Sequence, residues 1–129
     1  YFPDRYDDPP GECTSWVAAL WPGHRGGGVT WGGDAWEWYA NAAAQGYAVS
    51  PLPTVGAIAV FGRTGGSGGE WGHVAVVIGV GADAFRVTEM NRDARFLVDE
   101  RSVALGDPSL TGFIPVPADA VSSTAGAAP

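Results

Sequence analysis

The sequence predicts an α+β domain in which two helices pack on an antiparallel sheet of about five strands. Short apolar runs typical of strands fill the second half of the chain, whereas the clearest helical periodicity lies in the first half. The chain contains 20 Gly and 10 Pro, which favours turns and short strands over a helical bundle. Its 129 residues, of which 46% are hydrophobic, suffice for one domain with a buried core.

The two ends of the chain lack the periodicity of a helix or a strand. Residues 1–10 are rich in Pro and Asp and are expected to form an irregular lead-in. Residues 118–129 are small and polar, as in a linker or a disordered tail. The domain is therefore predicted to span residues 11–117.

Two helices are predicted in the first half of the chain. The run CTSWVAAL follows a Pro-Pro-Gly break and precedes a Trp-Pro-Gly turn, which predicts a helix over residues 13–20. A clearer helix is predicted over residues 34–45, because Asp34 and Glu37 are spaced as a capping box and Gly46 stands at the C′ position. One face of this helix repeats at helical spacing and is expected to be buried: Ala35, Trp38, Tyr39, Ala42 and Ala43.

Five strands are predicted, and two of them form a hairpin. Residues 73–80 are almost all β-branched or small, residues 85–90 alternate, and the segment between them has glycine and aspartate for a turn. The other strands are predicted over residues 57–61, 96–103 and 112–116.

The open end of the hairpin carries polar side chains. Because side chains alternate between faces, Glu89 and Asn91 continue the apolar face of Phe85 and Val87. His73 stands at the entrance of the first strand. An imidazole, a carboxylate and an amide are therefore expected to meet there. The alternative is a hairpin with polar ends and no chemistry.

Cys13 is the only cysteine, so an intrachain disulfide is excluded. A single cysteine is most often a small buried hydrophobe. A helix N-terminus, however, favours the thiolate over the thiol. With His73 as general base and Glu89 or Asn91 as its orienting group, Cys13 would be the nucleophile of an acyl transfer. We expect Glu89 to bind Nδ1 of His73, which leaves Nε2 toward Cys13.

Two aromatic residues and a second histidine complete the candidates. Trp31 and Trp71 are each followed by Gly and are predicted to be stacking surfaces for a substrate, with a place in the core as the alternative. His24 lies among glycines without a second ligand at metal spacing, so a solvated or locally hydrogen-bonded histidine is expected.

The charge of the chain restricts its partners. The formal charge is −7, and all seven basic residues are Arg, which argues against a nucleic acid or an anionic membrane as partner. No apolar run approaches the roughly 20 residues of a membrane span. Asp4, Asp7, Asp8 and Glu12 lack the spacing of an EF-hand loop, so we expect neither calcium nor another metal or cofactor.

Five blocks follow one another along residues 11–115: GECTSWV at 11–17, Trp31-Gly32 with Trp36, VGAIAV at 55–60, GHVAVV at 72–77 and EMN at 89–91. Together they resemble the successive motifs of CHAP domains, the cysteine, histidine-dependent amidohydrolases/peptidases. Two features depart from that pattern. The acidic lead-in does not reproduce the calcium loop of some phage members, and Val17 stands where a second aromatic residue is common.

The resemblance implies a papain-like fold of the NlpC/P60-CHAP type, with N-terminal helices packed on an antiparallel sheet of five or six strands. It also implies cleavage of bacterial peptidoglycan, as an N-acetylmuramoyl-L-alanine amidase or as an endopeptidase on stem or cross-bridge peptides. By position it assigns Cys13 as the nucleophile, His73 as the base, Glu89 as the group that orients it and Asn91 as a polar partner. We then expect a secreted or wall-associated monomer that can be linked to further domains.

Two other functions fit the sequence less well. A catalytically silent module could grip the cell wall through Trp31, Trp71 and acidic loops, but it has no use for an intact Cys, His and Glu set. A zinc hydrolase could use Cys13, His24 and His73 as ligands, but the HExxH motif is absent.

Overall fold

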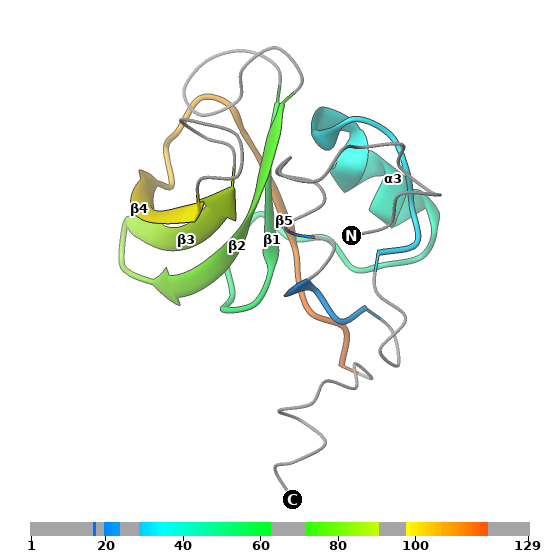
Figure 1. Cartoon of the computed structure of the whole chain (residues 1–129), viewed down its shortest axis with the longest axis horizontal. Helices are drawn as coiled ribbons and strands as arrows, with labels where there is room; N and C mark the ends of the chain where they lie inside the picture. The colour runs from blue at the N-terminus through cyan, green and yellow to red at the C-terminus, as the bar shows by residue number, and fades with distance from the viewer. Residues whose placement is uncertain (1–16, 18–19, 24–28, 63–71, 91–97, 119–129) are drawn as a thin grey trace, which may run out of the picture.

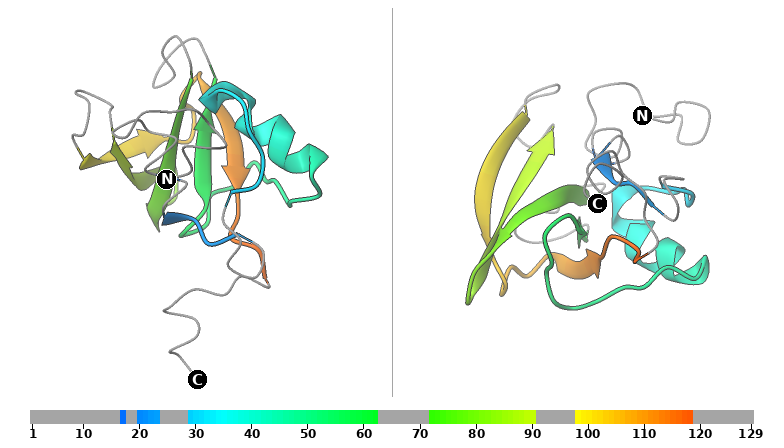
Figure 2. Two further views of the ribbon diagram at one scale, coloured as in Figure 1. Left: turned by 45° about the vertical axis from the view of Figure 1, so that its right-hand side comes forward. Right: turned by 90° about the horizontal axis from the view of Figure 1, so that it is seen from below.

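The computed structural model of the protein describes residues 17, 20–23, 29–62, 72–90 and 98–118. These residues form a curled antiparallel sheet with a short helical segment on one of its faces (Figures 1 and 2). The α+β prediction is confirmed. No helix among the described residues is long and apolar enough to cross a membrane.

The sheet has five strands in the order β4-β3-β2-β1-β5, and every neighbouring pair is antiparallel. Each predicted strand is present, with bounds that differ by at most two residues where the chain is described. The strands are β1 Ile58–Phe61, β2 His73–Val80, β3 Ala84–Met90, β4 Val98–Ala104 and β5 Leu110–Ile114.

The predicted helix over residues 34–45 begins as a 3₁₀ turn, η2 Ala35–Glu37, and continues as α3 Trp38–Ala44. The capping box forms: Oε1 of Glu37 accepts a hydrogen bond of 3.0 Å from the backbone N–H of Asp34. At the other end, Gly46 has a φ of +90°, as a C′ glycine does.

The buried face of this helix differs in part from the predicted one. Ala35, Trp38 and Ala42 are buried as expected, but Tyr39 is half-buried and Ala43 is exposed. A 3₁₀ residue advances about 120° around the axis instead of about 100°. The opening turn therefore rotates the buried stripe, and the prediction for Ala43 is wrong.

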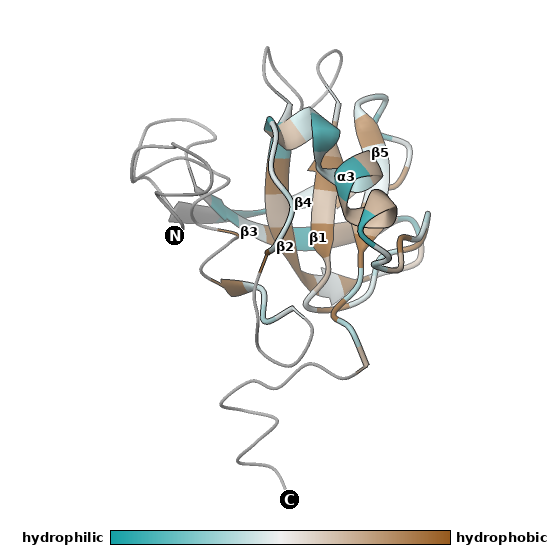
Figure 3. Ribbon diagram, turned by 90° about the vertical axis from the view of Figure 1, so that its right-hand side faces the viewer, coloured by the Kyte–Doolittle hydropathy of each residue, from teal (hydrophilic) through white to brown (hydrophobic). Residues whose placement is uncertain are grey.

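A tryptophan cluster fills the core between the helical segment and the sheet. Trp31 is 0% exposed, and its ring packs edge-on against Trp21 at 5.2 Å and Trp38 at 5.6 Å between centroids. The prediction that Trp31 is a stacking surface for a substrate is therefore wrong, because a ring inside the core cannot reach a ligand. Figure 3 shows α3 against the largely apolar strands β1 and β5.

A second core fills the other, concave face of the sheet. The rings of Phe85 on β3 and Phe113 on β5 meet edge-on at 5.0 Å. In a flat sheet these strands would lie three spacings apart, or about 14 Å. The sheet therefore curls strongly, and it encloses a face lined by Ala57, Ala59, Phe61, Ala75, Val77, Phe85, Val87, Val103 and Phe113.

Candidate active site

The first residue of β2, His73, is held against its neighbours by backbone geometry. It pairs with Phe61 of β1, and the two rings lie 5.7 Å apart. The preceding Gly72 has a φ of +74°, and a Cβ at this position would lie 2.6 Å from the backbone nitrogen of Trp36. Only glycine fits this turn, so the sequence Gly-His fixes where the imidazole enters the sheet.

His73 and Glu89 share the concave face of the sheet. The pairing of β2 with β3 is irregular between Val77 and Gly79. On the side of this irregularity that leads to His73, Val77 pairs with Val87, so odd-numbered residues of both strands point to the same face. The imidazole and the carboxylate are both almost completely shielded from solvent, at 5% and 0% exposure.

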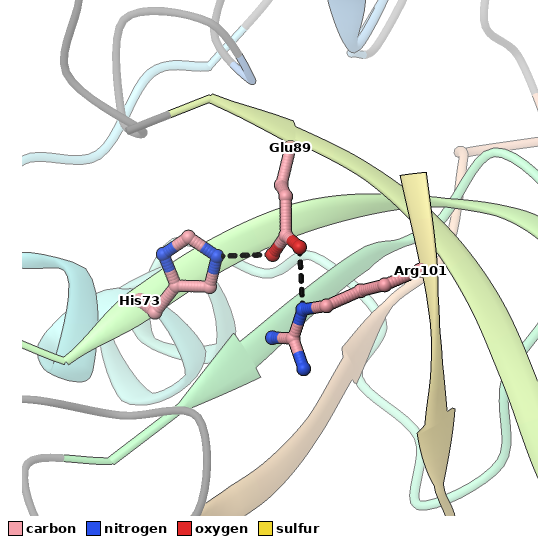
Figure 4. Close-up of polar contacts among 3 residues, drawn as sticks. All are labelled: His73, Glu89 and Arg101. Atoms are coloured by element: carbon pink, nitrogen blue, oxygen red, sulfur yellow. Dashed lines mark hydrogen bonds and ion pairs between the residues drawn. The ribbon is translucent and has the colours of Figure 1, made fainter. Parts of the chain in front are cut away.

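A short hydrogen bond joins these two side chains. Nε2 of His73 lies 2.6 Å from Oε1 of Glu89 (Figure 4). The sequence predicted that the two residues meet, and this contact is confirmed. The prediction that Glu89 binds Nδ1 is wrong, because Glu89 lies diagonally across from His73 and only the ring nitrogen farther from the backbone spans that gap. Nδ1 lies on the opposite side of the ring (Figure 4).

Arg101 of β4 is a third member of the site, and the sequence reasoning missed it. Its Nε donates a hydrogen bond to Oε2 of Glu89 (Figure 4). Arg101 pairs with Val87 in the β3–β4 register, which puts it one diagonal step from Glu89 on the same face. The two carboxylate oxygens thus have different partners: Oε1 binds the imidazole of His73, and Oε2 binds the guanidinium of Arg101.

The environment of Glu89 keeps its side chain ionised. Burial is the largest single effect and raises the pKa of Glu89, but the hydrogen bonds and the charges of His73 and Arg101 together outweigh it. The pKa of Glu89 is therefore lowered below its ordinary value. At neutral pH the site presents a carboxylate that accepts the Nε2 proton and fixes the tautomer of His73.

Several predicted residues lie outside the described part of the chain: Cys13, His24, Trp71 and Asn91. Of the first predicted helix only Val17 and Leu20 are described, and both are helical.

Trp36 is a large aromatic residue that is 38% exposed and lies beside the described part of the site. Its Cβ lies 2.7 Å from the position that a Cβ of Gly72 would take, immediately before His73. The sequence held a signal for this placement, because Trp36 falls off the apolar stripe of Ala35, Trp38 and Ala42.

Comparison with known proteins places the chain in a family. The sequence model of the CHAP domain matches residues 3–91. The chain is 38% identical over 96 residues to a putative hydrolase of Streptococcus mutans, which covers 70% of this chain and 39% of that protein. It is 42% identical over 82 residues to the staphylococcal secretory antigen SsaA of Staphylococcus aureus, covering 63% of this chain and 29% of that protein.

Among solved structures, the N-acetylmuramoyl-L-alanine amidase from Staphylococcus aureus superposes with a TM-score of 0.68 at 25% identity. The match covers 83% of this chain and 31% of the amidase chain. The chain therefore spans well under half the length of these relatives.

Proposed function

Because this chain belongs to the CHAP domain family, we propose that it hydrolyses an amide bond of bacterial peptidoglycan, with Cys13 as the nucleophile. The observation that carries the proposal is the buried pair of His73 and Glu89, joined at 2.6 Å. A domain that only binds the cell wall gains nothing from an imidazole held by an ionised, fully buried carboxylate. Such a pair is the base and the orienting group of a cysteine hydrolase.

In the proposed reaction, Nδ1 of His73 takes the proton of the Cys13 thiol, and the thiolate attacks the carbonyl carbon of the scissile amide. The tetrahedral intermediate expels the amine, which receives the proton from His73, and a thioester remains on Cys13. A water molecule then gives a proton to His73 and attacks the thioester, which releases the acid and restores the thiol. Glu89 stabilises the imidazolium that forms in each half of the cycle.

The remaining assignments follow from the same proposal. Asn91 is a polar partner of the site, and the catalytic domain spans residues 11–117, followed by a linker. The similarity to an N-acetylmuramoyl-L-alanine amidase favours the bond between the glycan and the stem peptide, with an endopeptidase cut within the peptides as the alternative. The similarity to a secretory antigen supports action outside the cell, at the wall.

Purified peptidoglycan tests this proposal. The wild-type protein should release fragments whose masses identify the bond: an intact stem peptide with a free N-terminal alanine marks an amidase, and a cut stem or cross-bridge marks an endopeptidase. Cys13→Ala should abolish the release. A matched control is Ser102→Ala, which removes one exposed polar atom on β4 and should leave the rate unchanged.

Hydrolysis that survives Cys13→Ala would contradict the cysteine mechanism. Binding of the wild-type protein to the wall without any release of fragments would favour the silent module instead.

A further inference from the structure

The carboxylate of Glu89 is held from both sides. His73 occupies Oε1 and Arg101 occupies Oε2, so neither oxygen can rotate away without losing a hydrogen bond to a cation or an imidazole. The side chain of Arg101 is about three quarters buried, at 26% exposure. Desolvation of the two charges in a buried ion pair offsets most of their attraction. The pair of Arg101 and Glu89 is therefore weak evidence that Arg101 serves only to stabilise the fold.

The charges of the site alternate when the proposed catalytic ion pair is included. The thiolate of Cys13 is negative, the imidazolium of His73 positive, Glu89 negative and Arg101 positive, so the set is neutral as a whole. Without Arg101 the same set would carry a net negative charge around a carboxylate and an imidazole that are 0% and 5% exposed, which costs more free energy than the neutral set.

We propose that Arg101 is a positioning residue of the catalytic site, which orients the carboxylate of Glu89 on His73 and sets the pH range of the reaction through its fixed charge. This inference rests on the proposed function. Other charged residues lie on the described parts of β3 and β4 as well. Asp99 is the register partner of Glu89, and the flanking pair of Arg86 and Glu100 is exposed, at 53% and 61%.

Arg101→Met and Arg101→Lys separate orientation from charge. In Arg101→Met the carboxylate loses one of its two anchors, and kcat should fall by about 10²-fold, as for a small misplacement of a catalytic group, while KM stays within about twofold. Removal of a positive charge raises the pKa of each neighbouring group, so both limbs of the pH–rate profile should move up by about one pH unit. Arg101→Lys keeps the charge, so its limbs should stay in place and part of kcat should return.

Arg86→Met is the matched control. It removes an arginine from the neighbouring strand β3, where its Nη2 lies 3.9 Å from Glu100 in an exposed pair. The rate and the pH limbs of this variant should equal those of the wild type.

A double-mutant cycle tests whether Arg101 acts through Glu89. In a Glu89→Gln background the carboxylate is already gone, so Arg101→Met should lower kcat by less than about twofold. A merely structural role predicts that the two losses multiply. Independent losses, or a wild-type pH profile in Arg101→Met, would overturn the inference.

Two further measurements keep the test decisive. If Arg101→Met fails to fold, Arg101→Gln keeps an N–H donor without the charge, and unmoved pH limbs in this variant would also overturn the inference. The pH dependence of iodoacetamide alkylation at Cys13 needs no substrate and should shift upward in the same way. Hydrolysis that persists in Cys13→Ala would instead refute the proposed function, whatever the Arg101 variants do.

Discussion

Glu89→Gln tests the centre of the proposed site with almost no change in shape. Both partners of the carboxylate, Nε2 of His73 and Nε of Arg101, donate hydrogen bonds to it. A glutamine amide has one oxygen that accepts and one NH₂ group that donates, so it can satisfy both partners only if Nε2 of His73 accepts and the imidazole carries its proton on Nδ1. The variant thus loses the negative charge and favours the tautomer of His73 in which Nδ1 is protonated and cannot accept the proton of Cys13.

The expected effect on catalysis is large. Without the carboxylate the imidazolium loses its stabilising charge, and the Nε2 proton is no longer fixed. We expect kcat to fall by roughly 10² to 10⁴, the range of lost acid–base catalysis and of mispositioned triads. The measurement is kcat and KM on one defined muropeptide.

The effect on stability depends on pH. Loss of one member of a buried pair costs roughly 3–5 kcal/mol, and the lower end applies here because Arg101 retains some solvent access. The pKa of Glu89 is lowered in the folded protein, so its contribution to stability is complete above the unfolded pKa of about 4.3. That contribution disappears as the pH falls through the folded pKa. The difference in unfolding free energy between wild type and Glu89→Gln should therefore be greatest at neutral pH and shrink below about pH 4.

Denaturant unfolding at several pH values measures this difference, with Glu100→Gln as control. Glu100 is 61% exposed and lies 3.9 Å from Arg86, so its loss should change stability by well under 1 kcal/mol and leave kcat unaltered. A near-normal kcat for Glu89→Gln, together with reduced stability, would refute the catalytic role and leave Glu89 as a structural anion.

Two further predictions concern the surroundings of His73. Gly72→Ala should destabilise the fold by at least about 2 kcal/mol, as measured by denaturant unfolding. The reason is that φ is positive at this position and that an added Cβ would lie 2.6–2.7 Å from backbone atoms. Gly32→Ala is the control and should be nearly neutral, because an added Cβ there meets open space. Trp36→Ala should raise KM for peptidoglycan several-fold with little effect on kcat if its exposed ring contacts substrate, while Trp36→Phe retains most of the affinity. An unchanged KM in Trp36→Ala would exclude that contact.

Local patterns in the sequence determined the elements of the fold but not which tryptophan reaches solvent. Alternation and turn residues predicted both strands of the hairpin to within one residue. The glycine beside Trp31 was read as a sign of exposure, yet the ring lies in the core. Burial there depends on packing against Trp21 and Trp38, which lie 10 and seven residues away and meet Trp31 only in the folded chain. Neighbouring residues alone could not distinguish the two cases.

Arg101 was missed for a different physical reason. Its distance from Glu89 depends on the β3–β4 register, and that register depends on the connection between the strands. The sequence places an arginine on a strand that follows Glu89, but a shift of one residue would point its side chain to the other face. The pairing of Val87 with Arg101 is therefore the fact that only the structure supplies.

The meeting of His73 with Glu89 depends on one irregularity in the hairpin. At the closed end, Val80 pairs with Phe85. Farther along, Val77 pairs with Val87. Between these two pairs β2 advances by three residues and β3 by only two. The extra residue is a β-bulge around Ile78, and its side chain is exposed, at 39%.

Without the bulge, the closed end would dictate a different site. A regular ladder continued from it would pair Val76 with Glu89, and His73, three residues before Val76, would point to the opposite face, toward the tryptophan core. Gly79 beside the bulge is the residue type that often accompanies one, but it does not say where the extra residue falls. The same two strands could thus form from this sequence without bringing the imidazole and the carboxylate together. The additional residue at Ile78 is what places His73 and Glu89 on the same face of the sheet.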